Sequence, residues 1–368
     1  MIHDLYNIIS IFITVGILLT CGLSLLFVAV PDTPLLSNYR KARNMMAVAY
    51  LFFMAVNLAE FLFSDYGENN VPLIQTITLA IAVSQALLFT MALLALLEVR
   101  FPGWRYIFRQ LIPATMLIIV IFVVYTFCSD AFFEIAFYGF SGLYALLLAY
   151  YTRLFMVKYS HFRLRMDNYF SDNEAGRIKW IAFSFFAALM IGIMALLTTV
   201  FMSIFVAMIF TVVFDIFYIW FALRFINFTH RFHIIEKALD NDPEDEIATV
   251  TCDLPTTQST VFFILEKKIE QWVADKQFIE KGITVSILSD KLQTNRHYLS
   301  SYINTSKGKT FREWINQLRI EEAKNLMHQH PDMTVNEIAL QVGFTDKSHF
   351  IRQFTNLSGV SPKVWKKS

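Results

Sequence analysis

Seven apolar runs occupy most of the first 228 residues and restrict what this chain can fold into. They lie near residues 8–30, 45–63, 71–97, 107–127, 133–157, 178–200 and 203–225. A helix needs about 20 consecutive apolar residues to cross a bilayer, and each run is long enough. Hydrophobic residues make up 56% of the sequence and charged residues 17%, whereas soluble domains are about half apolar and about a quarter charged. We therefore expect an all-α chain in which residues 1–228 form a seven-span membrane domain, with a short turn near Met202.

The charged residues between these runs predict an orientation in the membrane. Basic residues fill every second loop: Arg40, Lys41 and Arg43, then Arg100, Arg105 and Arg109, then Arg153, Lys158, Arg163, Arg165, Arg177 and Lys179. The other loops hold Asp65, Glu68 and Asp130 and no Lys or Arg. Because cytoplasmic loops are enriched in Lys and Arg, we expect the N-terminus outside and the C-terminus in the cytoplasm.

Asp215 lies near the middle of the seventh run. A carboxylate at that depth is costly unless it is protonated, paired or facing a cavity, so it is a candidate for sensing a signal in the membrane. Its expected partners are uncharged, for example Asn57 or Gln85, because no Lys or Arg lies deep in any span. The alternative is a hydrogen-bonded acid that only holds the bundle together.

Residues 229–258 are predicted to join the membrane domain to a C-terminal domain. Apolar residues at helical spacing, from Phe225 to Leu239, alternate with Arg231 and Lys237 and indicate an amphipathic extension of the seventh helix. Such a helix lies on the inner leaflet or pairs with a second subunit in a homodimer. The acidic turn 241–246 and the polar stretch 249–260, which contains Pro255, have the composition of a linker.

From residue 259 onward the pattern changes to ordinary amphipathic helices, and one motif occurs twice, about 50 residues apart. The apolar positions Leu288, Leu292 and Leu299 correspond to Ile338, Val342 and Phe350, with Gly343 in the second turn. This spacing predicts helix-turn-helix units at about 285–304 and 335–356, joined by a helix over about 311–328. A rod of that length, roughly 25 Å, could hold two recognition helices about one DNA turn apart.

Local capping signals agree with these predicted helices. Thr334 and Glu337 have the spacing of a capping box at the first helix of the second unit. Asn295 is suited to cap the recognition helix of the first unit, and Thr345 or Asp346 that of the second.

The C-terminal 100 residues closely resemble the AraC/XylS family of bacterial transcription regulators. The resemblance is carried by Trp314-x3-Leu318-Arg319-Ile320-x2-Ala323-x2-Leu326 and by Ile338-Ala339-x3-Gly343-Phe344-x3-Ser348-x-Phe350-x3-Phe354-x4-Gly359-x-Ser361-Pro362-x2-Trp365. It implies an all-helical DNA-binding domain over residues 259–368 whose two recognition helices contact bases. The soluble ligand-binding barrel that usually precedes this domain is replaced here by the apolar runs, so its metabolite-binding role does not carry over.

By this resemblance, DNA contacts come from the exposed faces of both recognition helices. The positions are Arg296, His297, Ser300 and Ser301 in the first and Lys347, Ser348 and Arg352 in the second. A guanidinium can pair bidentately with guanine, so Arg352 is the strongest candidate for reading a base, and Lys347 for touching phosphate. The alternative is that these are solvated surface residues.

The overall expectation is a regulator in the bacterial inner membrane that binds double-stranded promoter DNA. Residues 259–368 contain 16 Lys+Arg against 11 Asp+Glu, and the rest 15 against 19, so the predicted DNA-binding end is the basic one. The expected partners are this DNA, the lipid bilayer, RNA polymerase and a second copy of the chain, besides a signal ligand of unknown nature. Cys21, Cys128 and Cys252 are isolated, so neither a disulfide framework nor a metal site is expected, and no cofactor or enzymatic motif is apparent.

Two other functions stay open from the sequence. The first is a transporter or channel with an appended regulatory domain, in which Asp215 and the polar residues Gln75, Ser84 and Gln85 would line a pathway. The absence of a broken helix or an internal repeat in the spans counts against it. The second is a degenerate DNA-binding domain used only for contacts with other proteins.

Overall fold

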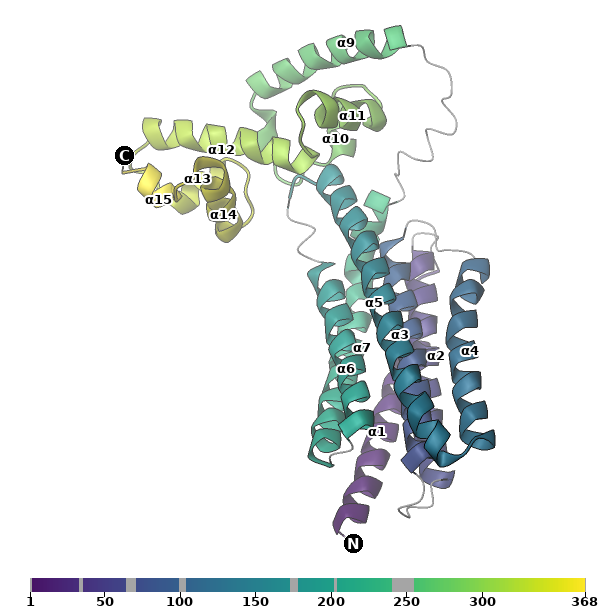
Figure 1. Ribbon diagram of the computed structural model, residues 1–368. Coiled ribbons are helices and arrows are strands. Elements are labelled where there is room, and N and C mark those ends of the chain that lie inside the picture. The colour runs from purple at the N-terminus through teal and green to yellow at the C-terminus, as the bar shows by residue number, and fades with distance from the viewer. Residues whose placement is uncertain are drawn as a thin grey trace. The chain divides into compact units, whose positions relative to one another are not determined.

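The computed structural model describes residues 2–32, 36–63, 71–98, 104–172, 178–201, 204–239 and 255–367. Within these ranges every regular element is an α- or 3-10 helix, which confirms the expected all-α class. The chain divides into two compact units (Figure 1). The first is Met1–Ser160 with Trp180–Asp240, and the second is His161–Lys179 with Asn241–Ser368.

The first unit contains the seven predicted apolar helices. They are α1 (Ile2–Phe27), α2 (Ser37–Phe63), α3 (Val71–Leu97), α4 (Trp104–Phe127), α5 (Asp130–Tyr169), α6 (Lys179–Phe201) and α7 (Ile204–Leu239). All seven are long and apolar enough to cross a membrane, with mean hydropathies between 1.3 and 2.4. The seven predicted spans are thereby confirmed as helices. The turn expected near Met202 and the loop charges Asp65, Glu68, Arg100 and Arg177 lie outside the described residues.

Helices α2 and α5 extend beyond their predicted apolar runs into segments that carry charged residues. Helix α2 begins at Ser37 and includes the basic residues Arg40, Lys41 and Arg43. Helix α5 has 40 residues and runs to Tyr169, and its last nine residues belong to the second unit. Lys and Arg favour helix as strongly as most apolar residues, so a span need not end where its apolar run ends.

The surface of the seven-helix unit is apolar, as a lipid-facing surface requires. Phe12, Ile135 and Phe205 are 58%, 75% and 74% exposed, and many other large apolar side chains are exposed with them. Inside the unit, some buried polar groups find partners on the backbone of a neighbouring helix. The buried hydroxyl groups of Tyr39 and Tyr50 each donate a 2.8 Å hydrogen bond from α2 to a carbonyl oxygen of α7, as a bilayer interior demands.

The second unit contains the C-terminal helices. They are α9 (Pro255–Ala274), η4 (Gln277–Ile279), α10 (Val285–Lys291), α11 (Arg296–Ser306), α12 (Phe311–Gln329), α13 (Val335–Gln341), α14 (Lys347–Ser358) and α15 (Pro362–Trp365). Helix α9 begins at Pro255, inside the stretch predicted as a linker, because proline is well suited to the first turn of a helix. The predicted acidic turn 241–246 and Cys252 lie outside the described residues.

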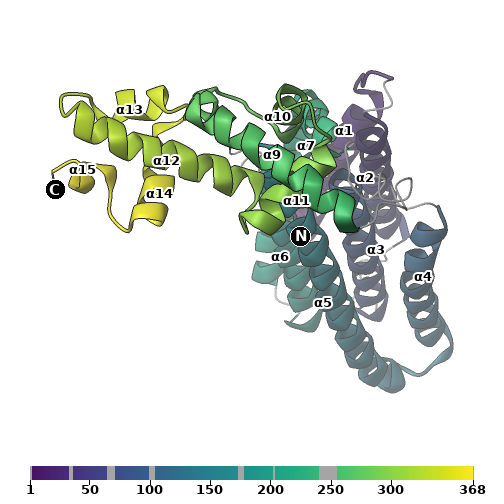
Figure 2. The same ribbon diagram turned by 90° about the horizontal axis from the view of Figure 1, so that it is seen from above.

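Helix α12 is shared by two hydrophobic cores. Its first half contributes Phe311, Trp314 and Ile315 to a core formed with α9, α10 and α11. Its second half contributes residues such as Ile320 and Ala323 to a core formed with α13 and α14. Figures 1 and 2 both show α12 running from one helix group to the other. A 19-residue helix is about 28 Å long, so α12 is a rigid rod that carries a helix-turn-helix unit at each end.

The capping interactions follow the sequence closely. Thr334 and Glu337 form the predicted capping box of α13, and Asn295 caps α11. Of the two candidates for α14, the structure selects Asp346, whose carboxylate accepts from the backbone nitrogens of Ser348 and His349. A second capping box, which the sequence analysis did not identify, is made by Thr310 and Glu313 at the start of α12.

Gly343 makes the turn between α13 and α14 with φ of 91°. A Cβ added there would lie 2.1 Å from the backbone oxygen of Ile279. The corresponding turn of the first unit uses Gln293, also at positive φ of 50°. The second turn therefore requires glycine mainly because another backbone approaches it, and only partly because of its dihedral angle.

We predict that Gly343→Ala destabilises the C-terminal helical region far more than Gly282→Ala. Gly282 also has positive φ, but nothing lies within 4 Å of an added Cβ, so alanine there should cost only the strain of the left-handed conformation, roughly 1–2 kcal/mol. At Gly343 the clash with the Ile279 carbonyl adds to that strain. Urea unfolding of a fragment comprising residues 255–368 measures both, and equal losses would contradict the close approach.

Candidate DNA-binding site

Helices α11 and α14 each bury one face in their own core and present the opposite face outward. Leu299 anchors α11, and Phe350 and Phe354 anchor α14. On α14, the predicted contacts Lys347, Ser348 and Arg352 are exposed. On α11 the predicted contacts are partly exposed and lie one turn apart: Arg296, His297, Ser300 and Ser301. Both sets lie on helix faces that a groove could accept, and their role in DNA contact stays a prediction.

The first turn of α14 contains a buried histidine beside a guanidinium. His349 is 6% exposed, and its Nε2 lies 3.1 Å from the Nη2 of Arg312 on α12. Burial lowers the pKa of His349 to about 4, helped by the positive charges of Arg312 and Arg352, while Asp172 and Asp346 act in the opposite direction. The imidazole is therefore neutral at neutral pH, and its ring packs on Phe344.

Arg319 is a charged residue on α12 in the second unit, and its sequence position alone did not indicate a role for it. Its side chain is fully buried, and it donates to the carbonyl oxygens of Phe278 and Glu280 at 3.0 and 2.7 Å. Its Nη1 donates to Asp172 Oδ1 at 3.2 Å. Burial lowers the pKa of Arg319, and the carboxylate of Asp172 opposes that shift. The residue holds the loop before α10 against α12, which fixes the first helix-turn-helix unit on the rod.

Comparison with known proteins identifies this part of the chain. Residues 288–368 match the family model described as "Helix-turn-helix domain". The chain is also similar to HTH-type transcriptional activators RhaR over 116 residues: 28% identical to those of Salmonella schwarzengrund (strain CVM19633) and Salmonella dublin, and 29% identical to that of Salmonella heidelberg (strain SL476). The C-terminal part of the chain is an AraC-type helix-turn-helix domain. Each match covers 32% of this chain and 39% of the relative's own length, and no solved structure matches.

The match is confined to the AraC-type domain, and the seven-helix unit has to be interpreted from its own residues. Asp215 on α7 accepts a hydrogen bond from Thr14 on α1, with 3.1 Å between Thr14 Oγ1 and Asp215 Oδ2. The partner is uncharged, as expected, but the two named candidates, Asn57 and Gln85, were wrong: α1 packs directly on α7, and Asn57 donates to the Phe53 carbonyl of its own helix. The other carboxylate oxygen, Oδ1, is buried and has no hydrogen-bond partner among the described residues.

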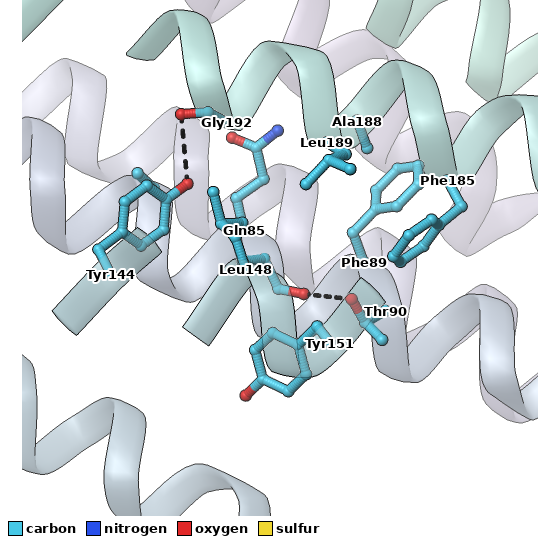
Figure 3. Close-up of a pocket in the computed structure, with 12 residues that line it drawn as sticks. Gln85, Phe89, Thr90, Tyr144, Leu148, Tyr151, Phe185, Ala188, Leu189 and Gly192 are labelled. Atoms are coloured by element: carbon cyan, nitrogen blue, oxygen red, sulfur yellow. Dashed lines mark hydrogen bonds between the residues drawn. The ribbon is translucent and has the colours of Figure 1, made fainter. Parts of the chain in front are cut away.

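A small cavity lies between α3, α5 and α6 (Figure 3). The side chains of Gln85, Tyr144 and Tyr151 line it, and Gln85 Nε2 is buried without a partner among the described residues. The Tyr144 hydroxyl points toward the Gly192 carbonyl oxygen, 3.5 Å away. The cavity measures about 20 Å³, which is room for about one water molecule. Ser84, another candidate for a pathway, donates to the Ala80 carbonyl of its own helix.

No group of three or more metal-ligating side chains occurs among the residues that the structure describes. Cys21 and Cys128, the two cysteines within those ranges, are both free thiols. Neither observation assigns a cofactor to the chain.

We predict that acid weakens the AraC-type domain through His349. Because its pKa falls from 6.5 in the unfolded chain to about 4 in the folded one, the unfolded chain binds the proton first as the pH is lowered. The free energy of unfolding should therefore fall between pH 6.5 and pH 4. The fragment 255–368 lacks Asp172, whose charge raises the pKa of His349. Its absence leaves the pKa of His349 lowered, so acid should destabilise the fragment in the same way.

Urea unfolding of that fragment at pH 7 and pH 5 measures the decrease in the free energy of unfolding, and His349→Gln should make this decrease smaller. His328, an exposed histidine on α12, provides the matched control His328→Gln, which should leave the loss unchanged. An identical pH dependence in wild type and His349→Gln would contradict the assignment.

Proposed function

We propose that this chain is a membrane-anchored one-component transcription regulator. Its AraC-type domain binds promoter DNA in a sequence-specific manner, and the seven-helix unit controls that binding in response to a signal. The observation that carries the proposal is the pair of helix-turn-helix units fixed to the two ends of α12. A single rigid rod of about 28 Å suits two recognition helices that enter successive major grooves about 34 Å apart.

The roles of the DNA-contacting residues follow from their chemistry. Arg352, exposed on the second turn of α14, is assigned to a guanine edge, where a guanidinium donates two parallel hydrogen bonds. Lys347 starts the same helix and is assigned to a phosphate, as is Arg296 at the start of α11. His297, Ser300, Ser301 and Ser348 complete the two contacting faces.

We further propose that the N-terminus faces outward and the AraC-type domain lies in the cytoplasm of a bacterial cell. The support is the distribution of basic residues over the helix ends. Arg40, Lys41 and Arg43 open α2, Arg109 lies near the start of α4, and Lys158 lies near the end of α5, where it pairs with Glu98 at 2.7 Å. These helix ends belong to alternate connections, which the positive-inside rule assigns to the cytoplasm.

The membrane unit is proposed to act as the sensor, with Asp215 as its candidate sensing residue. The half-satisfied carboxylate of Asp215 supports this, because a partly buried acid with one buried, unpaired oxygen is sensitive to protonation or to a new hydrogen-bond donor. Helix α7 continues to Leu239 without a break, which supports transmission along it, against the inner leaflet or a second copy of the chain. RNA polymerase is the proposed protein partner, since the similar RhaR proteins are named transcriptional activators. The water-sized cavity and the self-bonded Ser84 give the transporter alternative no support.

We predict that Arg352→Ala weakens specific DNA binding by roughly 1–3 kcal/mol. The affinity for the cognate site should fall by this amount, and the affinity for random DNA should change little, because the substitution removes a contact to a base. Chromatin immunoprecipitation with sequencing first supplies the target, and the full-length chain in lipid nanodiscs then binds it in a gel-shift titration.

Two matched variants make this measurement specific. Lys347→Ala should weaken cognate and random DNA alike and reduce the salt dependence of binding. Lys267→Ala removes an exposed cation from α9, outside the helix-turn-helix units, and should change affinity by less than about twofold. An unchanged footprint for Arg352→Ala would refute the assignment of that residue.

We also predict that a reporter joined after Ser368 is active only in the cytoplasm. A fluorescent protein fused there should fluoresce, and alkaline phosphatase fused at the same place should be inactive. The control is a fusion at Gly67, in the acidic connection between α2 and α3, which should give the opposite pair of results. Phosphatase activity after Ser368 would overturn the orientation and, with it, access to chromosomal DNA.

A further inference from the structure

The second unit includes a segment from the membrane half of the sequence, residues 161–172, which we name the docking segment. It consists of the end of α5 and the turn that follows. Phe170 forms an isolated antiparallel bridge with Thr284, and the Ser171 nitrogen donates to the Ile283 oxygen at 3.1 Å. Tyr169 packs against the first core of the AraC-type domain. The segment is therefore seated on the first helix-turn-helix unit by its backbone as well as its side chains.

Two ion pairs join the docking segment to α12. Asp167 Oδ1 lies 2.7 Å from Arg312 Nη1, and Asp172 Oδ1 lies 3.2 Å from Arg319 Nη1. Arg312 and Arg319 are seven residues apart, so they occupy one face of the rod two turns apart. The side chains of the two arginines are 12% and 0% exposed, and those of the two aspartates 21% and 20%. Solvent exposure makes most surface ion pairs weak, and these two are largely protected from it.

Arg312 extends this contact to the second recognition helix. While its Nη1 is held by Asp167, its Nη2 lies 3.1 Å from Nε2 of His349 in the first turn of α14. Lys347 and Ser348, both predicted to contact DNA, immediately precede His349. The carboxylate of Asp167 thus pairs with the guanidinium of Arg312, which lies against the start of α14, a helix predicted to contact DNA.

A DNA phosphate and Asp167 would compete for this guanidinium. Helix N-termini favour anions, and a guanidinium binds carboxylate and phosphate with the same planar set of donors. With Asp167 in place, Arg312 is nearly covered. Withdrawal of the aspartate would leave the guanidinium beside the start of α14 for a phosphate of the DNA backbone.

We propose that the docking segment is an autoinhibitory clamp, in which Asp167 holds Arg312 away from DNA until α5 moves. This inference rests on the proposed DNA-binding function and adds its regulation. Because α5 is one continuous helix from Asp130 to Tyr169, Asp167 lies on the same helix as a membrane-spanning segment, which gives a route for the proposed displacement. Asp172 and the Phe170–Thr284 bridge set the register in which Asp167 meets Arg312.

The first test locks the clamp with a disulfide. Residues opposite one another in an antiparallel pair have Cα atoms about 4.5–5.5 Å apart, within the range of about 4.4–6.8 Å that a disulfide spans. In a full-length chain with Cys21, Cys128 and Cys252 changed to alanine, Phe170→Cys and Thr284→Cys supply the pair. In nanodiscs, oxidation should weaken binding to the cognate DNA by at least about fivefold, and dithiothreitol should restore it.

The control carries Thr284→Cys alone and should respond to neither treatment. Because the locked and released forms are the same protein preparation, a folding defect cannot imitate the reversible change. Equal affinity of the oxidised and reduced forms would overturn the clamp.

The second test removes the competing charge. Asp167→Asn should tighten cognate binding by about fivefold, whereas Asp332→Asn, which removes an equal charge from an exposed turn, should change it by less than about twofold. In an Arg312→Gln background, Asp167→Asn should have no effect, since the contested guanidinium is gone. An equal gain in both backgrounds would show a general charge effect and would overturn the proposal.

The experiments distinguish a failure of the proposed DNA-binding function from a failure of the clamp. If the wild-type chain binds no DNA, the proposed function fails, and the clamp fails with it. If that chain binds DNA but neither the lock nor Asp167→Asn changes its affinity, the clamp alone is wrong.

Discussion

The AraC-type domain depends on one buried guanidinium. Arg319 lies between the two cores that share α12, with three oxygen partners contributed by Phe278, Glu280 and Asp172. A buried charge without partners costs several kcal/mol, so the carbonyls of Phe278 and Glu280 keep Arg319 partnered within the domain, and Asp172 adds a third partner when the docking segment is in place. Two of the partners are backbone carbonyls that precede α10, and the third belongs to the docking segment. The residue that organises the two helix-turn-helix units is therefore also the residue through which the α5 end of the membrane half is attached.

The membrane half is organised by a different constraint. Without water in the bilayer core, each polar group needs a protein partner, and tyrosine hydroxyls of α2 find theirs on the backbone of α7. Asp215 departs from this pattern, because Thr14 satisfies one carboxylate oxygen and the other is unpaired among the described residues, as is the Nε2 of Gln85. A site that leaves a polar atom unsatisfied in such surroundings has a lower cost for changing its hydrogen bonds than a satisfied one. This is the physical reason for proposing Asp215 as the sensing residue.

Much of this architecture could be predicted from local sequence signals. Three features depend on signals from neighbouring residues, and the structure bears them out: the apolar runs, the capping box of Thr334 and Glu337, and the turn at Gly343. The partner of Asp215 could not be predicted, because it depends on which helices pack together, and α1 and α7 are about 200 residues apart in sequence. The burial of Arg319 and its pairing with Asp172 were missed for the same reason, since arginine is ordinarily an exposed residue. Nothing in the sequence of residues 161–172 separates them from an ordinary basic loop between two spans.

The covalent connection between the docking segment and the AraC-type domain determines how strong their contact has to be. For two parts of one chain, docking is intramolecular, so the effective concentration of one part at the other determines how much of the contact is formed. A contact whose dissociation constant is about a quarter of that effective concentration would be about four-fifths occupied, and its release would tighten DNA binding about fivefold. Two protected ion pairs and a backbone bridge are sufficient for such a contact, whereas specific DNA sites are typically bound at about 10⁻⁸ to 10⁻¹¹ M. A clamp of this strength would be displaced by a cognate DNA site and not by a weak one. A modest shift of α5 would be enough to change the fraction of molecules in which the clamp is closed. In the proposed clamp, weak intramolecular docking would therefore let a movement within the membrane regulate tight binding to DNA.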